Sequence, residues 1–484
     1  MRLFRTSSVA VAALALALSA CDDGLTDINE NPNAPEDVGP DLLFPQGTVR
    51  AVQTIRGGGW DLHLTSLWAQ HFAKIQYVDE DFYEIRSTSN ETYWIQLYAG
   101  ALEDLVDAER RALRANRPNQ AAPAMIMKAW TFGAMTDMWG DIPFTQANKG
   151  DSGVTAPVYD TQEDVYAGIS DMLQEAVGMI PGTGLGYAGA DPIYGGDVAL
   201  WEKFANSLRA RYGLRLSEVA ATTAQSEVVA ALAAGVFTSL ADQAELHWPG
   251  DGTNDHPIYT NNVTGNRDDH RISRTMVDTL KRLNDPRLPF YAQLPSDPSV
   301  TTYVGVENGL SSDSAGKLGL GKTSRIGTLF AYQADAPSIL MSYWEVLFIR
   351  AEAAARGWTA ENAATLYADA IRANMRWLGI SDADIATYLA QASVVYNPAR
   401  GLEQIALQKW ISLYGQGSEA FAEWRRTGYP GLTPGPASIT QPRSVARRLT
   451  YPLIEQSLNK SSHDEAVSRQ GGADITDRVW WDVP

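Results

Sequence analysis

Residues 340–378 read LMSYWEVLFIRAEAAARGWTAENAATLYADAIRANMRWL, and the expected fold is decided by this stretch. Its apolar residues recur three and four positions apart, at Leu340, Tyr343, Trp344, Leu347, Phe348, Ala351, Ala354 and Ala355. This spacing places them along one face of an α-helix. Gly357 ends that helix, and a second helix is predicted over residues 360–378. The stretch is therefore expected to form a helical hairpin.

The same pattern extends outward along the chain. Further helices are predicted from residue 94 to near residue 118, and over residues 121–138, 165–180, 200–219, 402–414 and 419–424. Asp160 and Glu163 resemble a capping box in front of the helix at 165–180. Small residues on facing sides make these pairs similar to tetratricopeptide hairpins, although no fixed repeat period is present. The predicted fold class is mainly α, with irregular tetratricopeptide-like helix hairpins wrapped by long loops and few short strands.

Long segments rich in Pro, Gly, Asn and Asp separate the hairpins. They cover residues 182–196, 248–266 and 295–337, and a short strand is expected at 301–306 within the last of them. Loops of this length in a compact protein usually carry function. No linker divides the remainder of the chain, so residues 41–484 are predicted to form one domain.

The N-terminus has the pattern of a bacterial lipoprotein signal. Arg2 and Arg5 precede a short apolar run at residues 9–18, and small residues lead to Cys21. The run is too short to span a bilayer, which needs about 20 apolar residues. We therefore predict a signal peptide over residues 1–20, lipid attachment at Cys21 and a flexible lipidated tether over residues 21–40. Since Cys21 is the single cysteine, an intrachain disulfide and a cysteine-based metal site are excluded.

The composition describes an acidic globular protein. The formal net charge is −18, and no basic run with interleaved aromatic residues offsets it. Such a surface repels phosphate backbones, so nucleic-acid binding is not expected. The 14 Trp and 20 Tyr side chains provide flat faces that fill cores and also stack on sugars.

Two glycine-rich motifs match nucleotide-binding patterns without the required context. GKLGLGKT at residues 316–323 fits a phosphate loop, but a polar segment precedes it and no helical pattern follows. GLGYAG at residues 184–189 fits a dinucleotide fingerprint, but it follows a predicted helix where a strand is needed. We therefore predict no cofactor.

The ionisable residues do not form a recognisable catalytic or metal motif. The 6 histidines include His63 and His71, eight residues apart on a predicted helix, but none has a metal-ligand spacing. Asp251, Asn254 and Asp255 lack the alternation of a calcium loop. No serine-hydrolase elbow is present, and a lipidated Cys21 cannot be a nucleophile. No metal and no enzymatic activity are predicted, while a pair of carboxylates for glycoside hydrolysis stays open as an alternative.

Many short segments, taken in order, resemble the SusD-like (RagB/SusD) family of outer-membrane nutrient-binding lipoproteins. The resemblance runs from the Cys21 anchor to the C-terminus. The segments are DIN at 27–29, NPN at 31–33, WGDIPF at 139–144, YDTQ at 159–162, GGD at 195–197, WEKFANSL at 201–208, NDPR at 284–287, YVG at 303–305, QKW at 408–410, EWRRTGYP at 423–430 and RRLTYP at 447–452.

Most of these residues are expected to be structural. Gly140 and Gly428 suit turns that need a permissive backbone. Trp201 and Trp424 are expected in the core, and Arg425 and Arg426 are expected to bind carbonyls or carboxylates.

The resemblance implies binding and handover of a nutrient. It implies a lipoprotein anchored in the outer membrane, exposed at the cell surface, that acts as a lid on a TonB-dependent (SusC-like) β-barrel transporter. The implied cargo is an oligosaccharide or, as in other members, a peptide. Two other interpretations stay open: a lipid-anchored glycan hydrolase and a structural helix-repeat scaffold.

A glycan site needs aromatic faces for sugar rings and polar side chains for hydroxyls. From loop context and composition, the candidates near the first helices are Trp60, Tyr77, Tyr83 and Trp94. Those in the long insertions are Trp248, Tyr259, Asn261, Asn262 and Tyr303.

Overall fold

The computed structural model describes residues 38–180 and 186–483. The predicted signal peptide, Cys21 and the tether up to residue 37 lie outside the described residues. The first described helix, α2 (Pro40–Ile55), begins where the tether was predicted to end. Among the described residues, no helix combines the length and the apolar character needed to cross a membrane.

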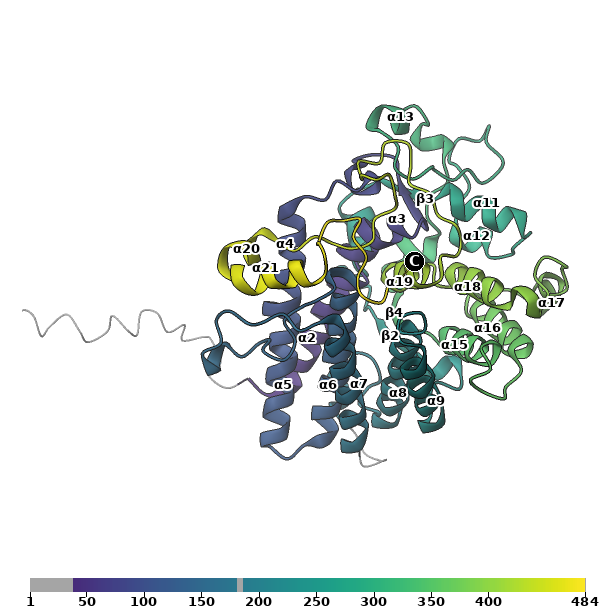
Figure 1. The fold of residues 1–484 in the computed structure, drawn as a ribbon. Coiled ribbons are helices and arrows are strands. Elements are labelled where there is room, and N and C mark those ends of the chain that lie inside the picture. The colour runs from purple at the N-terminus through teal and green to yellow at the C-terminus, as the bar shows by residue number, and fades with distance from the viewer. Residues whose placement is uncertain (1–37, 181–185, 484) are drawn as a thin grey trace, which may run out of the picture. The chain divides into compact units, whose positions relative to one another are not determined.

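Helical hairpins form the body of the protein, as predicted (Figure 1). Helices α5 to α9 stand in a row, each packed on the next, and α15, α16, α18 and α19 form a second group. Helices α8 and α15 are in contact and join the two groups. The bounds are α5 Glu103–Arg114, α6 Pro118–Trp139, α7 Gln162–Met179, α8 Val198–Arg215, α9 Ala221–Ala234, α15 Tyr343–Ala355, α16 Ala363–Trp377, α18 Gly401–Ser412 and α19 Gly417–Thr427.

The hairpin predicted from residues 340–378 is formed by α15 and α16. Side-chain caps start both helices, because Ser342 accepts a hydrogen bond from the Glu345 amide and Asn362 accepts one from the Thr365 amide. Leu340 is an exception to the prediction. It lies in strand β4 (Pro337–Met341), because the chain is extended until the Ser342 cap.

The capping box predicted at Asp160 and Glu163 is wrong. Thr161, one residue after Asp160, caps α7 and accepts a hydrogen bond from the Asp164 amide. Asp160 instead accepts hydrogen bonds from the Phe144 and Thr145 amides.

The helix predicted from residue 94 to near 118 is interrupted. It consists of α4 (Ser87–Ile95), the π-helix η4 (Gln96–Leu102) and α5.

The described strands form two small antiparallel sheets, β1 (Phe72–Lys74) with β3 (His270–Ile272) and β2 (Ala244–His247) with β4. The strand predicted at 301–306 is absent from this fully described segment. Only Val306 forms an isolated bridge, with Ser273.

The long insertions contain short helices. These are α10 Pro257–Tyr259, η8 Thr260–Thr264, α11 Arg274–Arg282, α12 Leu288–Tyr291, α13 Ser312–Gly316, η9 Leu320–Lys322 and α14 Thr328–Ala331. The remaining short elements are η2 Asp61–Thr65, α3 Ser66–Trp68, η3 Asp79–Phe82, η5 Gly150–Ser152, η6 Ala188–Ala190, η7 Leu240–Asp242, α17 Asp382–Leu389, η10 Pro398–Arg400, α20 Leu453–Leu458 and α21 Lys460–Arg469.

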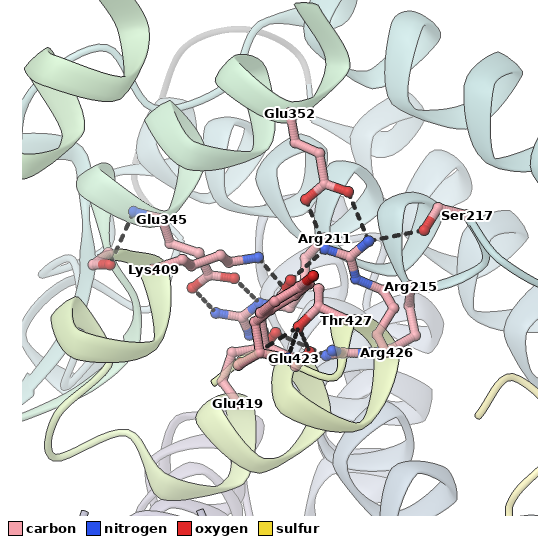
Figure 2. Close-up of polar contacts among 12 residues, drawn as sticks. Arg211, Arg215, Ser217, Glu345, Glu352, Lys409, Glu419, Glu423, Arg426 and Thr427 are labelled. Carbon is pink, nitrogen blue, oxygen red and sulfur yellow. Dashed lines mark hydrogen bonds and ion pairs between the residues drawn. The ribbon is translucent and has the colours of Figure 1, made fainter. Parts of the chain in front are cut away.

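A buried network of ion pairs joins the two groups of helices (Figure 2). Arg211 on α8 donates to both carboxylate oxygens of Glu345 on α15, at 2.7 and 2.6 Å. Arg215, one turn further along α8, donates to both oxygens of Glu419 on α19, at 2.8 Å each. Arg426 binds Glu352 at 2.7 Å, and Lys409 on α18 binds Glu423 at 2.7 Å. The network therefore connects α8, α15, α18 and α19.

The neighbouring cations keep Glu419 and Glu423 ionised in a buried environment. Burial alone would raise the pKa of Glu423, but Arg426 and Lys409 outweigh it and hold that pKa well below its ordinary value. The same balance lowers the pKa of Glu419, with Arg215 and Arg211 as the neighbouring cations. Each of these charged side chains is tolerated in the core only because it is paired, since a buried charge without a partner is strongly destabilising.

The structure agrees with the roles expected for the family-like segments. Gly140 and Gly428 have φ values of 78° and 72°, which favour glycine. Trp201 and Trp424 are buried. Arg425 donates to the carbonyl oxygens of Asp137 and Arg447 at 2.7 Å each, and Arg426 binds carboxylates.

Replacing Glu345 by Gln should destabilise the fold strongly. The change removes the charge that binds both sides of the buried Arg211 guanidinium, and the remaining carboxylate, Glu419 at 3.5 Å, is already bonded to Arg215. Loss of one partner of a buried pair costs about 3–5 kcal/mol. The free energy of unfolding, measured by denaturant titration, should fall accordingly.

The matched control is Glu361→Gln, which removes a glutamate paired with Arg350 in a partly exposed position. It should leave the unfolding midpoint almost unchanged, because solvent screens such pairs. Equal effects of the two substitutions would contradict the role given to the buried network.

Candidate functional site

The candidate ligand-binding residues differ in their exposure to solvent. Five of them are buried: Trp60, Tyr83, Trp94, Trp248 and Asn262. Tyr259, Asn261 and Tyr303 are half-buried. Tyr77 is 60% exposed, the largest exposure of an aromatic side chain among the described residues.

The buried aromatic candidates have packing partners that occupy their rings. Trp60 lies edge-on to Trp139, with ring centroids 5.4 Å apart. The Trp248 indole donates to Ser338 Oγ in β4 at 2.9 Å, which fixes its orientation. In this conformation these two side chains do not offer a free ring face to a sugar.

Trp94 has a different environment. Its ring contacts those of Trp139 and Tyr98, yet it also lines a hollow of about 390 Å³ with Tyr98, Glu103 and Asn148. Only part of this indole faces the hollow, since the residue is 5% exposed.

Tyr77 lies where the pairing of β1 with β3 brings two distant loops together. Lys74 at the end of β1 pairs with His270 at the start of β3, and the Ile75 amide donates to the Asp269 carbonyl at 2.8 Å. The Tyr77 loop therefore lies against the segment before β3. The Arg267 guanidinium is 4.6 Å from the Tyr77 ring centroid, a cation–π contact.

Arg267 connects this aromatic ring to a group of polar side chains. Arg267 Nε donates to Asp269 at 2.9 Å, and Lys74 Nζ binds Glu80 at 2.5 Å. The His63 ring, on η2, is 5.2 Å from that of His270. We call the group of Tyr77, Arg267, Lys74, Glu80 and His63 the Tyr77 site.

The two imidazoles at this site are neutral. Burial, together with the Lys74 and Arg267 cations, lowers the pKa of His63 to about 3. Burial lowers the pKa of His270 well below its ordinary value, with His63 and Lys74 contributing. Among the described residues, His63 Nδ1 and both ring nitrogens of His270 find no hydrogen-bond partner. Neutral imidazoles can donate and accept, as recognition of hydroxyl groups requires.

The base of the Tyr77 site is rigid. Asp81 accepts hydrogen bonds from the Lys74 amide at 3.0 Å and from Asn308 at 2.7 Å, and burial raises the pKa of its carboxyl to about 6. On the other side, Asp61 in η2 accepts a hydrogen bond from the Ser418 amide at 2.8 Å. These contacts attach both supporting segments to the helical body.

The candidate ligand-binding residues Asn261 and Asn262 lie next to the Tyr77 site, whereas Tyr303 lies elsewhere. The Arg267 amide donates to the Asn262 carbonyl at 3.1 Å, so the η8 turn with Asn261 and Asn262 leads directly into the Tyr77 site. Asn262 is fixed by donating to the Ala331 carbonyl at 3.3 Å. Tyr303 lies beside α11 instead, where its carbonyl accepts a hydrogen bond from Lys281 at 2.7 Å.

Sequence reasoning missed Arg267, Lys74 and Glu80 as site residues. In the sequence they resemble ordinary surface charges, and only the β1–β3 register brings them to Tyr77. His63 was noticed together with His71 because of their spacing. The two have different surroundings, because His71 Nε2 contacts the Trp410 carbonyl at 3.0 Å in the core.

The glycine-rich motif at residues 316–323 does not have the surroundings of a nucleotide-binding loop. Residues 316–323 follow the short helix α13 and contain η9, without the strand and helix of a phosphate loop. The motif at 184–189 lies partly outside the described residues. Within residues 38–180 and 186–483, no three His, Cys, Asp or Glu side chains converge in a way that could hold a metal ion.

The fold defines a tetratricopeptide-like helical protein, and similarity to known proteins identifies its family. The family SusD-like_2, described as "Starch-binding associating with outer membrane", matches residues 39–452. The chain therefore belongs to the SusD-like family. None of the curated proteins matches the sequence.

Several solved structures are similar to this chain. A chitin-binding protein has a TM-score of 0.80 and 28% identity, with 91% of this chain and 100% of the other covered. A chitin-binding SusD homologue from Flavobacterium johnsoniae has a TM-score of 0.79 and 25% identity, over 91% and 98% of the two chains. A SusD homologue from Bacteroides uniformis shares the fold, with a TM-score of 0.81 and 24% identity over 91% and 99%.

His63 and His247 should titrate differently in NMR spectra of the imidazole rings. His63 has a pKa of about 3 and should show no shift between about pH 8 and pH 5. The pKa of His247 is raised by its hydrogen bond with Glu245, so this ring should titrate at a higher pH than a free imidazole. A His63→Asn variant assigns the signal, and titration of His63 near its ordinary pKa would contradict its buried environment.

The same shift has a consequence for stability. The pKa of His63 falls from 6.5 to about 3 on folding, so its contribution to the free energy of unfolding is present above pH 6.5. That contribution is lost as the pH falls toward 3.

Proposed function

We propose that this protein binds an oligosaccharide at the Tyr77 site and delivers it to a TonB-dependent, SusC-like outer-membrane transporter. The observation that carries the proposal is the exposed Tyr77 ring, fixed beside Arg267 on a rigid base. Membership of a family described as starch-binding supports a glycan as cargo, as do two relatives whose names state chitin binding.

The chemistry of the Tyr77 site suits a sugar. The apolar face of a pyranose ring stacks on an aromatic ring, and its hydroxyls need donors and acceptors at the edge. Arg267 covers one part of the Tyr77 ring, and the 60% exposure of the residue leaves surface for a ligand. Glu80 and the neutral His63 ring, both half-buried, supply polar groups, and the buried Lys74 ammonium holds Glu80 in place. The Trp94 hollow, with Glu103 and Asn148, is a second place where a longer glycan could make contact.

Anchoring and handover form the second part of the proposal. Lipidation of Cys21 would hold the protein at the outer membrane, facing the cell exterior, with residues 22–40 as the tether. Family membership supports outer-membrane association, since the family description includes it. In this arrangement the domain closes over the transporter and releases its cargo inward.

The proposed activity is binding without bond breaking. The similar proteins whose names state a ligand are described as binding proteins. A hydrolase would release products from a glycan polymer, a peptide-uptake protein would prefer peptides, and a structural scaffold would bind no soluble nutrient. These three alternatives therefore differ in direct assays.

Replacing Tyr77 by Ala should weaken glycan binding. Loss of a stacking platform is worth about 1 kcal/mol, so the Kd for oligomers of N-acetylglucosamine or of glucose should rise about fivefold or more. Isothermal titration calorimetry with both oligomer series and a peptide mixture measures this change.

Tyr343→Ala is the matched control, since this half-buried tyrosine lies at the start of α15, outside the Tyr77 site. It should bind as the unmodified protein does. Unchanged binding by Tyr77→Ala, preference for peptides, or release of shortened glycan would each contradict the proposal.

Affinity capture from gently solubilised outer membranes should recover a TonB-dependent barrel in stoichiometric amount. A Cys21→Ser variant should leave the membrane fraction, because the lipid anchor cannot form. Recovery of the protein without a barrel, under conditions that preserve other barrel complexes, would contradict the handover.

A further inference from the structure

A second hollow, distinct from the Tyr77 site, lies at the C-terminal end of α19. Its volume is about 360 Å³, and five arginines line it together with two glutamates. The arginines are Arg356, Arg425, Arg426, Arg447 and Arg478. In a chain with a net charge of −18, such a concentration of cations requires an explanation.

Arg425 is the innermost of these cations and is 2% exposed. One of its terminal nitrogens donates to the carbonyl oxygens of Asp137 and Arg447, at 2.7 Å each. Its Nε and its other terminal nitrogen find no partner among the described residues. Burial, opposed by Asp137 and Asp482, lowers the pKa of Arg425 to about 10, so the group remains cationic at neutral pH. Its guanidinium lies 4.1 Å from the ring centroid of Phe421 and 4.6 Å from that of Trp481, so these cation–π contacts partly compensate the charge. The unpaired donors at its edge are not compensated by any hydrogen-bonded carboxylate among the described residues.

Arg447 and Arg478 share a single carboxylate. Arg447 binds Asp482 Oδ1 at 3.1 Å, and Arg478 binds the same oxygen at 2.5 Å. Each uses one terminal nitrogen for this contact, so within the part of the chain that the structure describes the remaining edge of each guanidinium has unpaired donors. Together with Arg425, this side of the hollow has three guanidinium groups near two aspartates, Asp482 and Asp137, and Asp137 also pairs with Arg215 at 3.4 Å.

The opposite side of the hollow is electrically balanced. Arg426 binds Glu352 at 2.7 Å, and Arg356 binds the same glutamate at 2.9 Å. Arg356 also binds Glu218 at 2.5 Å. The two glutamates in the lining repel a multiply charged anion more strongly than a singly charged one. The excess of positive charge is therefore confined to the side of Arg447 and Arg478.

We infer that this basic hollow binds the carboxylate group of a small organic acid. Arg447 and Arg478 supply the contacting donors, since planar guanidinium groups match carboxylates in a bidentate arrangement, and Arg425 lies behind them. Tyr429 and Leu402, which are 43% and 44% exposed, form an apolar wall for the body of the ligand. The volume accommodates a molecule of about monosaccharide size. A free acid and an acidic sugar share this chemistry.

Calorimetric titration of the full-length protein at constant ionic strength tests the inference. The probes are D-galacturonate, acetate and the neutral sugar D-galactose. Galacturonate should bind with a Kd of about 1–10 mM, and galactose should not compete for the hollow. Binding of acetate as tightly as galacturonate identifies the carboxylate alone as the ligand, whereas tighter binding of galacturonate identifies an acidic sugar. Both results support the inference.

Arg478→Gln and Arg447→Gln should each weaken galacturonate binding about tenfold, because each removes a charged donor. Their Arg side chains are 38% and 19% exposed, so a folded variant is expected for Arg478 in particular. Arg376→Gln is the matched control, since this exposed arginine pairs with Asp382 outside the hollow. Circular dichroism melting verifies the fold of all three variants.

Three results would overturn the inference. They are the absence of galacturonate and acetate binding up to about 10 mM, equal binding of galactose, and unchanged affinity in folded Arg478→Gln protein. Glycan binding at the Tyr77 site does not depend on this outcome, because no residue is shared between the two.

Discussion

The ion pair between Arg211 and Glu345 joins α8 to α15 where both side chains are buried. Its neighbours, from Arg215 and Glu419 to Lys409 and Glu423, extend the contact to α18 and α19. Such pairs need not add net stability, because desolvation offsets their attraction. A shift of one helix by a turn would leave a charge buried without a partner, which is far more costly. The network therefore specifies how the two groups of helices meet.

This constraint reaches the Tyr77 site through main-chain contacts. Arg211 and Arg56 both donate to the Leu340 carbonyl, at 3.0 and 3.3 Å. Arg56 also binds Ser418, whose amide donates to Asp61 at the start of η2. The segment that positions His63 is thus bonded to α19, the helix that contains Glu419 and Glu423. A rigid site on a helical scaffold follows from these bonds.

The helices could be predicted from the sequence, because apolar residues at helical spacing must face a common core. This holds for residues 340–378, apart from Leu340, whose place in β4 depends on pairing with a distant strand. The site was predicted less well. Trp60 and Trp248 were candidates by composition, but composition does not reveal which way a ring points. Arg267 was missed because its relation to Tyr77 exists only after β1 pairs with β3. The family-like segments identified the fold, but they did not show where a ligand would bind.

The Tyr77 site is assembled from two loops that meet at a three-residue strand pairing. Neither the Tyr77 loop nor the segment of η8 and Arg267 contributes a side chain to the ion network between the helices. Substitutions and insertions in these loops can accumulate without leaving a charge of that network unpaired. The loops of the proposed ligand site can therefore change while the ion pairs that fix the helical framework stay the same, so relatives with one architecture can differ in the ligands that they bind.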